Sequence, residues 1–206
     1  MENTGKIIRD ILKFYFSYIL IVLIAVPAVI YLLFYLAGEY LLQDGSSLED
    51  VLNSSMADDI SLVLGNLLII ALFLKKKYTG FSLDLSAGMR GKWGVFLWAL
   101  ILEISAVMPI NLFVAFLDLS DYNTAVASSG VPSVAGVLGI CLLAPLAEEL
   151  VMRGGIEERL LQRKGNAMTA IVVSSLLFAI LHMSPSLVIG AFLNGLLYGW
   201  VYYLTR

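Results

Sequence analysis

The chain has 206 residues, of which 60% are hydrophobic and 14% are charged. Ordinary soluble domains are roughly 45–50% apolar and about 25% charged, so the composition excludes such a domain and indicates a bilayer as solvent. The net charge of -3 is too small to suggest a nucleic-acid partner. The single cysteine, Cys141, excludes an internal disulfide and a thiolate zinc cluster.

Six segments are apolar enough to be membrane spans, each of which needs about 20 residues. The first, 14–37, follows a short basic stretch and is too long for the apolar core of a signal peptide. The sequence therefore predicts an all-α membrane bundle of about six spans. We assign residues 1–130 to N-terminal spans and loops, and residues 131–206 to the region that carries the chemistry. The predicted spans are 14–37, 60–74, 93–117, 133–152, 167–183 and 186–205.

Basic residues alternate between the predicted loops. They precede the first span, recur between the second and third spans, and recur again after the fourth, whereas the other two long loops contain no Lys or Arg. Because Lys and Arg accumulate on the cytoplasmic side, both termini are expected in the cytoplasm. The longest inner loop, 75–92, is either a substrate-gating or lipid-binding segment or a solvated connector held to anionic lipid by its lysines.

Ionisable residues at membrane depth are costly and indicate function. Glu148 and Glu149 close an apolar run, and Arg153 lies four residues after Glu149, which is the favourable order for an ion pair on one helix face. Glu148 is turned about 100° away and has no such partner, which suits a general base. We assign Glu103, in the third span, to structural hydrogen bonding.

His182 is the one histidine of the chain. Glu148 and His182 lie equally far from the predicted turn at Gly165-Asn166, 17 residues before and 17 after Gly165. If both arms are helical, the two side chains lie at one height, about 25 Å from the turn. The charged stretch 157–164 would protrude into the cytoplasm, which puts Glu148 about 14 Å deep. Phe178 lies one turn before His182 and would shield one side of its imidazole.

These residues resemble the CPBP family, which comprises CAAX-processing endopeptidases and bacteriocin-immunity or Abi-type membrane proteases. Glu148, Glu149 and Arg153 match its EExxxR motif, and Phe178 and His182 match its FxxxH motif. The resemblance is clear from about Val131 to the C-terminus. It implies a helical intramembrane endopeptidase in a bacterial cell membrane, with Glu148 and His182 activating a water and Glu149, Arg153 and Phe178 in support.

The sequence departs from the family in one respect, because it has no HxxxN or HxxxD motif after FxxxH. That motif is thought to stabilise the oxyanion, so we expect an impaired enzyme. Asn194 does not match it and is assigned to helix packing beside Gly195 and Gly199, a small-xxx-small pair.

Other readings remain open from the sequence. The chain could be a non-catalytic immunity or scaffold protein that binds a peptide or a membrane partner, or a small transporter that uses Glu148 and His182 as a proton relay. No cofactor is expected, although Glu148, Glu149 and His182 could together hold a divalent metal. The expected partners are membrane lipid and a peptide or membrane-protein substrate, and the oligomeric state is open.

The predicted topology can be tested with single-cysteine variants in a Cys141→Ala background. A cysteine at position 45 or 125 should react with an impermeant maleimide added from outside intact cells, because both positions lie in loops without Lys or Arg. Labelling of either position only after the cytoplasmic side is opened would contradict the topology.

Overall fold

The computed structural model describes residues 4–38, 55–79, 93–117, 133–162, 166–182 and 184–205. These residues are helical throughout apart from short turns and helix ends, which confirms the predicted all-α membrane bundle. Residues 80–92 of the inner loop lie outside the described residues, as do Gly165 and most of the outer loops. Asn166 is described, and it caps the helix that follows by accepting a hydrogen bond from the Met168 amide.

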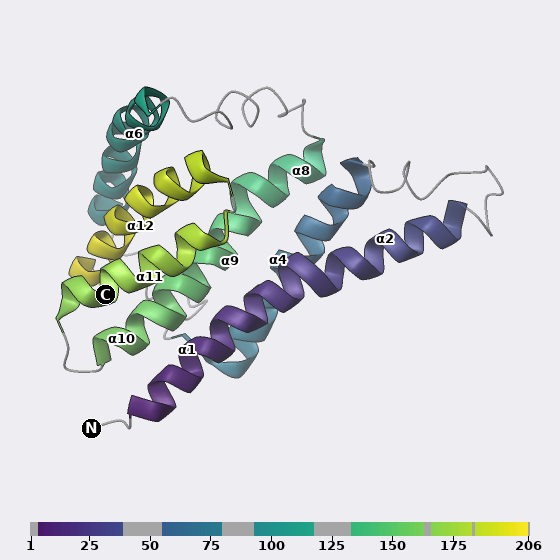
Figure 1. Ribbon diagram of the computed structural model, residues 1–206, viewed down its shortest axis with the longest axis horizontal. Coiled ribbons are helices and arrows are strands. Elements are labelled where there is room, and N and C mark those ends of the chain that lie inside the picture. The colour runs from purple at the N-terminus through teal and green to yellow at the C-terminus, as the bar shows by residue number, and fades with distance from the viewer. Residues whose placement is uncertain are drawn as a thin grey trace. The chain divides into compact units, whose positions relative to one another are not determined.

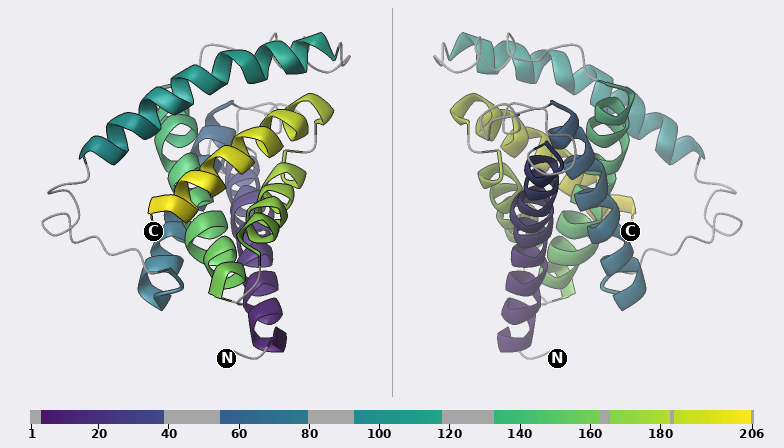
Figure 2. Two further views of the ribbon diagram at one scale, coloured as in Figure 1. Left: turned by 90° about the vertical axis from the view of Figure 1, so that its left-hand side faces the viewer. Right: turned by 90° about the vertical axis from the view of Figure 1, so that its right-hand side faces the viewer.

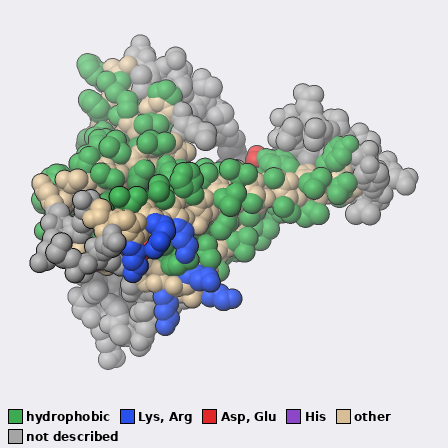
Figure 3. Space-filling model, turned by 60° about the horizontal axis from the view of Figure 1, so that its bottom comes forward, with side chains coloured by type: hydrophobic (Ala, Val, Ile, Leu, Met, Phe, Trp, Pro, Cys, Tyr) green, Lys and Arg blue, Asp and Glu red, His purple; other side chains and the backbone are tan. Residues whose placement is uncertain are grey.

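Each predicted span corresponds to a described helix. Four helices are long and apolar enough to cross a membrane, namely Thr4–Leu36, Ser55–Lys76, Val134–Gln162 and Pro185–Thr205. Shorter apolar helices occupy Leu100–Phe116 and Ala167–Ile180, in the third and fifth predicted spans. Large hydrophobic side chains are exposed along these helices, and they cover much of the described face in Figure 3. Such a surface is stable in contact with lipid, so the protein is an integral membrane protein.

The structure divides into two compact units, which alternate along the sequence. The first unit contains residues 1–7, 80–130 and 152–206, and the second contains residues 8–79 and 131–151. The division of the sequence at residue 130 stays a prediction.

The second unit is built around α4 (Ser55–Lys76), which contacts η1 (Ile19–Ala25), α2 (Val26–Leu36), α8 (Val134–Leu138), η3 (Gly139–Leu143) and α9 (Ala144–Glu149). Before η1 the chain forms α1 (Thr4–Tyr18), and α1, η1 and α2 run as one long helix (Figure 1). Small residues on one face of α4 are buried at four-residue spacing, which lets neighbouring helices approach closely. The buried residues of α4 are Ala57, Ser61, Gly65, Asn66, Ile69 and Phe73.

Both ends of α4 are fastened within this unit. At one end the aromatic rings of Phe14, Phe73 and Tyr78 pack against one another, with centroid distances of 4.9–5.4 Å. At the other end Asp59 accepts a hydrogen bond from Ser133, whose hydroxyl also caps α8 by accepting from the Gly136 amide. A carboxylate at a helix N-terminus is favourable because the unpaired amides there carry partial positive charge.

Two π-helical segments of this unit each end two residues before a proline. The segment η1 precedes Pro27, and η3 precedes Pro145. Proline cannot donate a backbone hydrogen bond and its ring crowds the preceding turn, so a wider turn there keeps the helix continuous. The helix that carries Glu148 therefore passes Pro145 without a break.

The first unit contains α6 (Trp93–Phe116), α10 (Glu158–Gln162), α11 (Ala167–Ile180) and α12 (Pro185–Thr205). The most extensive helix contact of this unit is between α11 and α12, and α12 also contacts α6 (Figure 2). The segment η4 (Leu150–Glu157) joins α9 to α10, and its residues from Met152 onward belong to this unit.

Candidate functional site: a motif helix and a buried arginine cluster

The helix of the first motif is continuous from Val134 to Gln162, and it passes Gly154 and Gly155 without interruption. From Leu150 to Glu157 it is π-helical. A π-helix bonds residue i to residue i+5, so side chains four apart are no longer in the register of an α-helix. The spacing argument for pairing Glu149 with Arg153 assumed α-helical register, and the pair stays a prediction.

Glu148 has a partner that helical spacing did not predict. The Tyr18 hydroxyl donates a hydrogen bond to Glu148 Oε1 at 3.4 Å, and Tyr18 is only 4% exposed. The two residues are 130 positions apart and belong to the same compact unit. The sequence-based view of Glu148 as a carboxylate without a partner on its own helix therefore omitted a contact from the first span.

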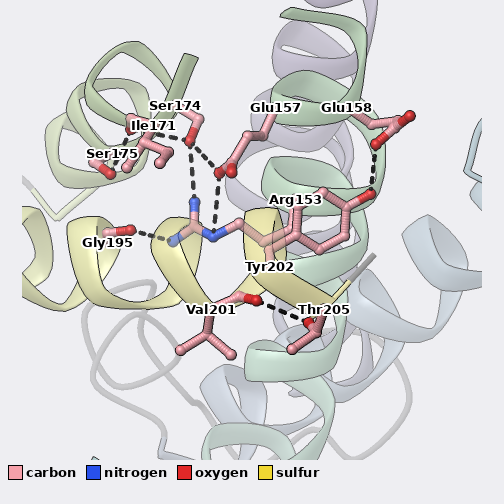
Figure 4. Close-up of polar contacts among 10 residues, drawn as sticks. All are labelled: Arg153, Glu157, Glu158, Ile171, Ser174, Ser175, Gly195, Val201, Tyr202 and Thr205. Atoms are coloured by element: carbon pink, nitrogen blue, oxygen red, sulfur yellow. Dashed lines mark hydrogen bonds and ion pairs between the residues drawn. The ribbon is translucent and has the colours of Figure 1, made fainter. Parts of the chain in front are cut away.

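Arg153 is buried at the centre of a polar cluster in the first unit (Figure 4). Its Nε lies 3.8 Å from Glu157 Oε2, which makes a buried ion pair. Its Nη2 donates to the Gly195 carbonyl at 3.1 Å, and its Nη1 donates to Ser174 Oγ at 3.4 Å. The guanidinium therefore connects η4 with α11 and α12.

Glu157 is fully buried within the protein, so its carboxylate is not the solvated group that a protruding stretch 157–164 predicts. Ser174 Oγ donates to Glu157 Oε2 at 2.8 Å, and Ser174 is itself fully buried. A charged pair removed from water is stable only when further hydrogen bonds complete it, and Ser174 supplies one. The depth of about 14 Å for Glu148 stays a prediction.

The small residues of α12 make room for this cluster. A side-chain Cβ on Gly199 would lie 2.8 Å from Glu157 Oε2, and one on Gly195 would lie 2.9 Å from the Ser175 Cβ. The predicted packing role of the Gly195/Gly199 pair is confirmed, because α11 and the Glu157 carboxylate occupy the space that larger side chains would need.

The second motif forms a compact pair at the end of α11. The rings of Phe178 and His182 are in edge contact, with centroids 4.9 Å apart and planes at 78°, so the predicted shielding of the imidazole is confirmed. His182 Nδ1 lies 3.2 Å from the Phe178 carbonyl. If Nδ1 carries the proton and donates there, Nε2 is the acceptor nitrogen. The Arg153 guanidinium lies 5.8 Å from the Phe178 ring centre, so a residue of each motif meets here.

The approach of Glu148 to His182 stays a prediction, since the two residues belong to different compact units. Within the described part of the chain, no group of three His, Cys, Asp or Glu side chains is arranged to hold a metal ion.

Two buried oxygen atoms lie on α6 and α12. Glu103 Oε2 and Asn194 Oδ1 have no hydrogen-bond partner among the described residues. The hydrogen bonding predicted for Glu103 is therefore not seen for this oxygen.

Sequence reasoning missed Tyr18, Glu157 and Ser174. A signal for two of them was present, because Glu157 follows Arg153 by four residues and Ser174 is one of the few hydroxyl residues in a largely apolar helix. Tyr18 gave no local signal, since nothing in its own span distinguishes it from the other tyrosines there.

The cluster predicts that Glu157→Gln destabilises the protein. The substitution removes a negative charge from a buried site that holds the Arg153 charge, which should cost on the order of 3 kcal/mol. Thermal unfolding in detergent measures the loss. Glu158→Gln is the matched control, because Glu158 accepts a hydrogen bond from Tyr202 at 3.0 Å and an amide oxygen can do the same. Equal effects of the two substitutions would contradict the assignment.

One family model matches the part of the chain that contains both motifs. Residues 130–206 match the family model described as Rce1-like, type II CAAX prenyl endopeptidase Rce1-like. Searches of curated proteins and of solved structures found no match. The matched region covers less than half of the chain but contains both motifs, the Arg153–Glu157 pair and α12. The resemblance to CAAX-processing endopeptidases of the CPBP family is therefore confirmed for residues 130–206.

Proposed function

We propose that the protein is an intramembrane endopeptidase of the CAAX-processing type, with a prenylated peptide or membrane protein as substrate. The observation that supports this most strongly is the family match over residues 130–206, which contains the EExxxR and FxxxH residues in order. The described helices, long and apolar enough to cross a membrane, supply the environment that a lipid-modified substrate would enter.

In this proposal Glu148 is the general base. Its carboxylate takes a proton from a water, the resulting hydroxide attacks the scissile carbonyl, and the proton passes to the leaving amine when the tetrahedral intermediate collapses. His182 would share this water through Nε2, with its Nδ1 held by the Phe178 carbonyl at 3.2 Å. The mechanism requires Glu148 and His182 to reach the same water, which is the approach predicted from their equal distances to Gly165.

Arg153 and Glu157 would act indirectly, by holding the end of the motif helix against α11 and α12. Phe178 would restrict the imidazole to one orientation, since its ring edge contacts His182. Glu149 remains a supporting residue that could meet the substrate.

We also propose a bacterial cell membrane as the location, with both termini in the cytoplasm. The alternation of basic loops with loops that lack Lys and Arg supports the orientation. Lys75, Lys76 and Lys77 are exposed at the end of α4, where they could contact anionic lipid headgroups.

The proposed activity can be tested with the purified chain in lipid nanodiscs and a farnesylated peptide that ends in a CAAX sequence. Glu148→Gln should lower kcat at least about 10²-fold, which is the usual contribution of a general base. Glu103→Gln is the matched control, because it changes a carboxylate with one buried oxygen outside the family match and should leave kcat unchanged. The same peptide without its prenyl group tests the need for the lipid.

Cleavage that survives Glu148→Gln would overturn the proposed role of Glu148. Tight binding of the prenylated peptide without any cleavage would favour the alternative, a non-catalytic scaffold or immunity protein.

The expected impairment is a separate prediction. Losing one oxyanion donor typically costs about 10²–10³ in rate, and the sequence contains no HxxxN motif to supply such a donor. The 206-residue chain should therefore cleave slowly, and a variant extended by a helix with the HxxxN pattern should cleave faster. An unextended chain whose rate equals that of the extended variant would show that the present residues suffice.

A further inference from the structure

We infer that Tyr18, in the first span, is a positioning residue for the Glu148 carboxylate. The inference rests on the proposed function, in which Glu148 is the base. It arises from the contact that joins the N-terminal helix to the first motif, where the Tyr18 hydroxyl donates to Glu148 Oε1. Tyr18 lies far outside the region that matches the family model, so the match does not assign it a role.

Packing in the second unit fixes the position of Tyr18. It is the last residue of α1 and is followed directly by the π-helical η1, which packs on α4. The approach is close, because a Cβ on Gly65 of α4 would lie 3.2 Å from the Val22 Cα in η1. The ring of Tyr18 is 4% exposed, so its hydroxyl has little freedom to turn toward lipid or water.

The helix α4 also contacts the segment that carries Glu148. A Cβ on Gly139 would lie 2.8 Å from Leu62 Cδ2 of α4, and α4 also contacts α9, where Glu148 lies. Tyr18 and Glu148 are therefore brought together by two close contacts on one helix. A hydrogen bond between elements that are both packed on α4 can define an orientation, whereas a bond between mobile side chains cannot.

The bond distinguishes the two oxygens of the carboxylate. A glutamate side chain has several rotatable bonds, and a base must keep one oxygen aimed at its water. A donor fixed on Oε1 restricts rotation of the carboxylate and so holds both oxygens in one orientation. At 3.4 Å the bond is longer than the usual O–H···O distance of about 2.7–2.8 Å. Catalytic hydrogen bonds are often long before substrate binds and shorten in the complex.

The long N-terminal helix also provides a matched control. Tyr31, in α2, donates its hydroxyl to a different carboxylate, that of Asp58. Tyr18→Phe and Tyr31→Phe therefore remove the same atom from the same helix, and each removes a bond to a carboxylate. Only the first change affects Glu148.

The experiment uses the full chain in nanodiscs and two readouts. With the farnesylated CAAX peptide, Tyr18→Phe should lower kcat about 10-fold with KM unchanged, which is the loss expected for a hydrogen bond to a charged group. Tyr31→Phe should leave kcat unchanged. Infrared difference spectra between wild type and Tyr18→Phe should show a shifted glutamate carboxyl or carboxylate band, and the same comparison in a Glu148→Gln background should not.

The readouts separate failure of this inference from failure of the proposed function. A carboxyl or carboxylate band shift that persists in the Glu148→Gln background, or no shift of such a band in the wild-type background, would overturn the contact. A shifted band with unchanged kcat would overturn the positioning role. Cleavage that survives Glu148→Gln, or no cleavage by the wild type, would count against the proposed function, and the infrared bands would still decide whether Tyr18 holds Glu148.

Discussion

The buried guanidinium of Arg153 is the constraint on which the first unit depends. Arg153 is 2% exposed. An unpaired charge at such a buried position would lower the stability of the fold by several kcal/mol. The chain satisfies it with a carboxylate one turn along, a serine of α11 and a backbone carbonyl of α12. Each of these groups must come close enough to bond, so the charge dictates how η4, α11 and α12 meet.

Pairing the buried Arg153 charge also depends on uncharged residues nearby. The α12 helix can approach only because Gly195 and Gly199 leave space for Ser175 and for the Glu157 carboxylate. Between helices in lipid there is little hydrophobic driving force, so close contact and hydrogen bonding must supply the stability. The charged pair, the serine that bonds it and the glycines of α12 therefore depend on one another for their packing. A larger residue at Gly199 would displace the counter-charge of Arg153.

Glu148 and Glu157 lie on one continuous helix but have different surroundings. Glu157 is enclosed by the arginine cluster and serves the fold. Glu148 accepts a hydrogen bond from a tyrosine hydroxyl, which orients its carboxylate. In the proposed function Glu148 is the base, and a base must be held in one orientation toward its water, which a fixed hydroxyl donor would favour.

The sequence by itself determined the solvent, the helices and the two motifs. Apolar run length predicts spans from local composition alone, and residues four apart on α11 are neighbours in any helix, so Phe178 and His182 pair as expected. Only the tertiary structure decided that Glu157 is buried and that Tyr18 reaches Glu148 across 130 positions. The partner of a polar side chain in lipid is set by which helices pack together, and the small residues that permit such packing do not name their partner in the sequence. The π-helical turn after Glu149 likewise changes the register from which local spacing was counted.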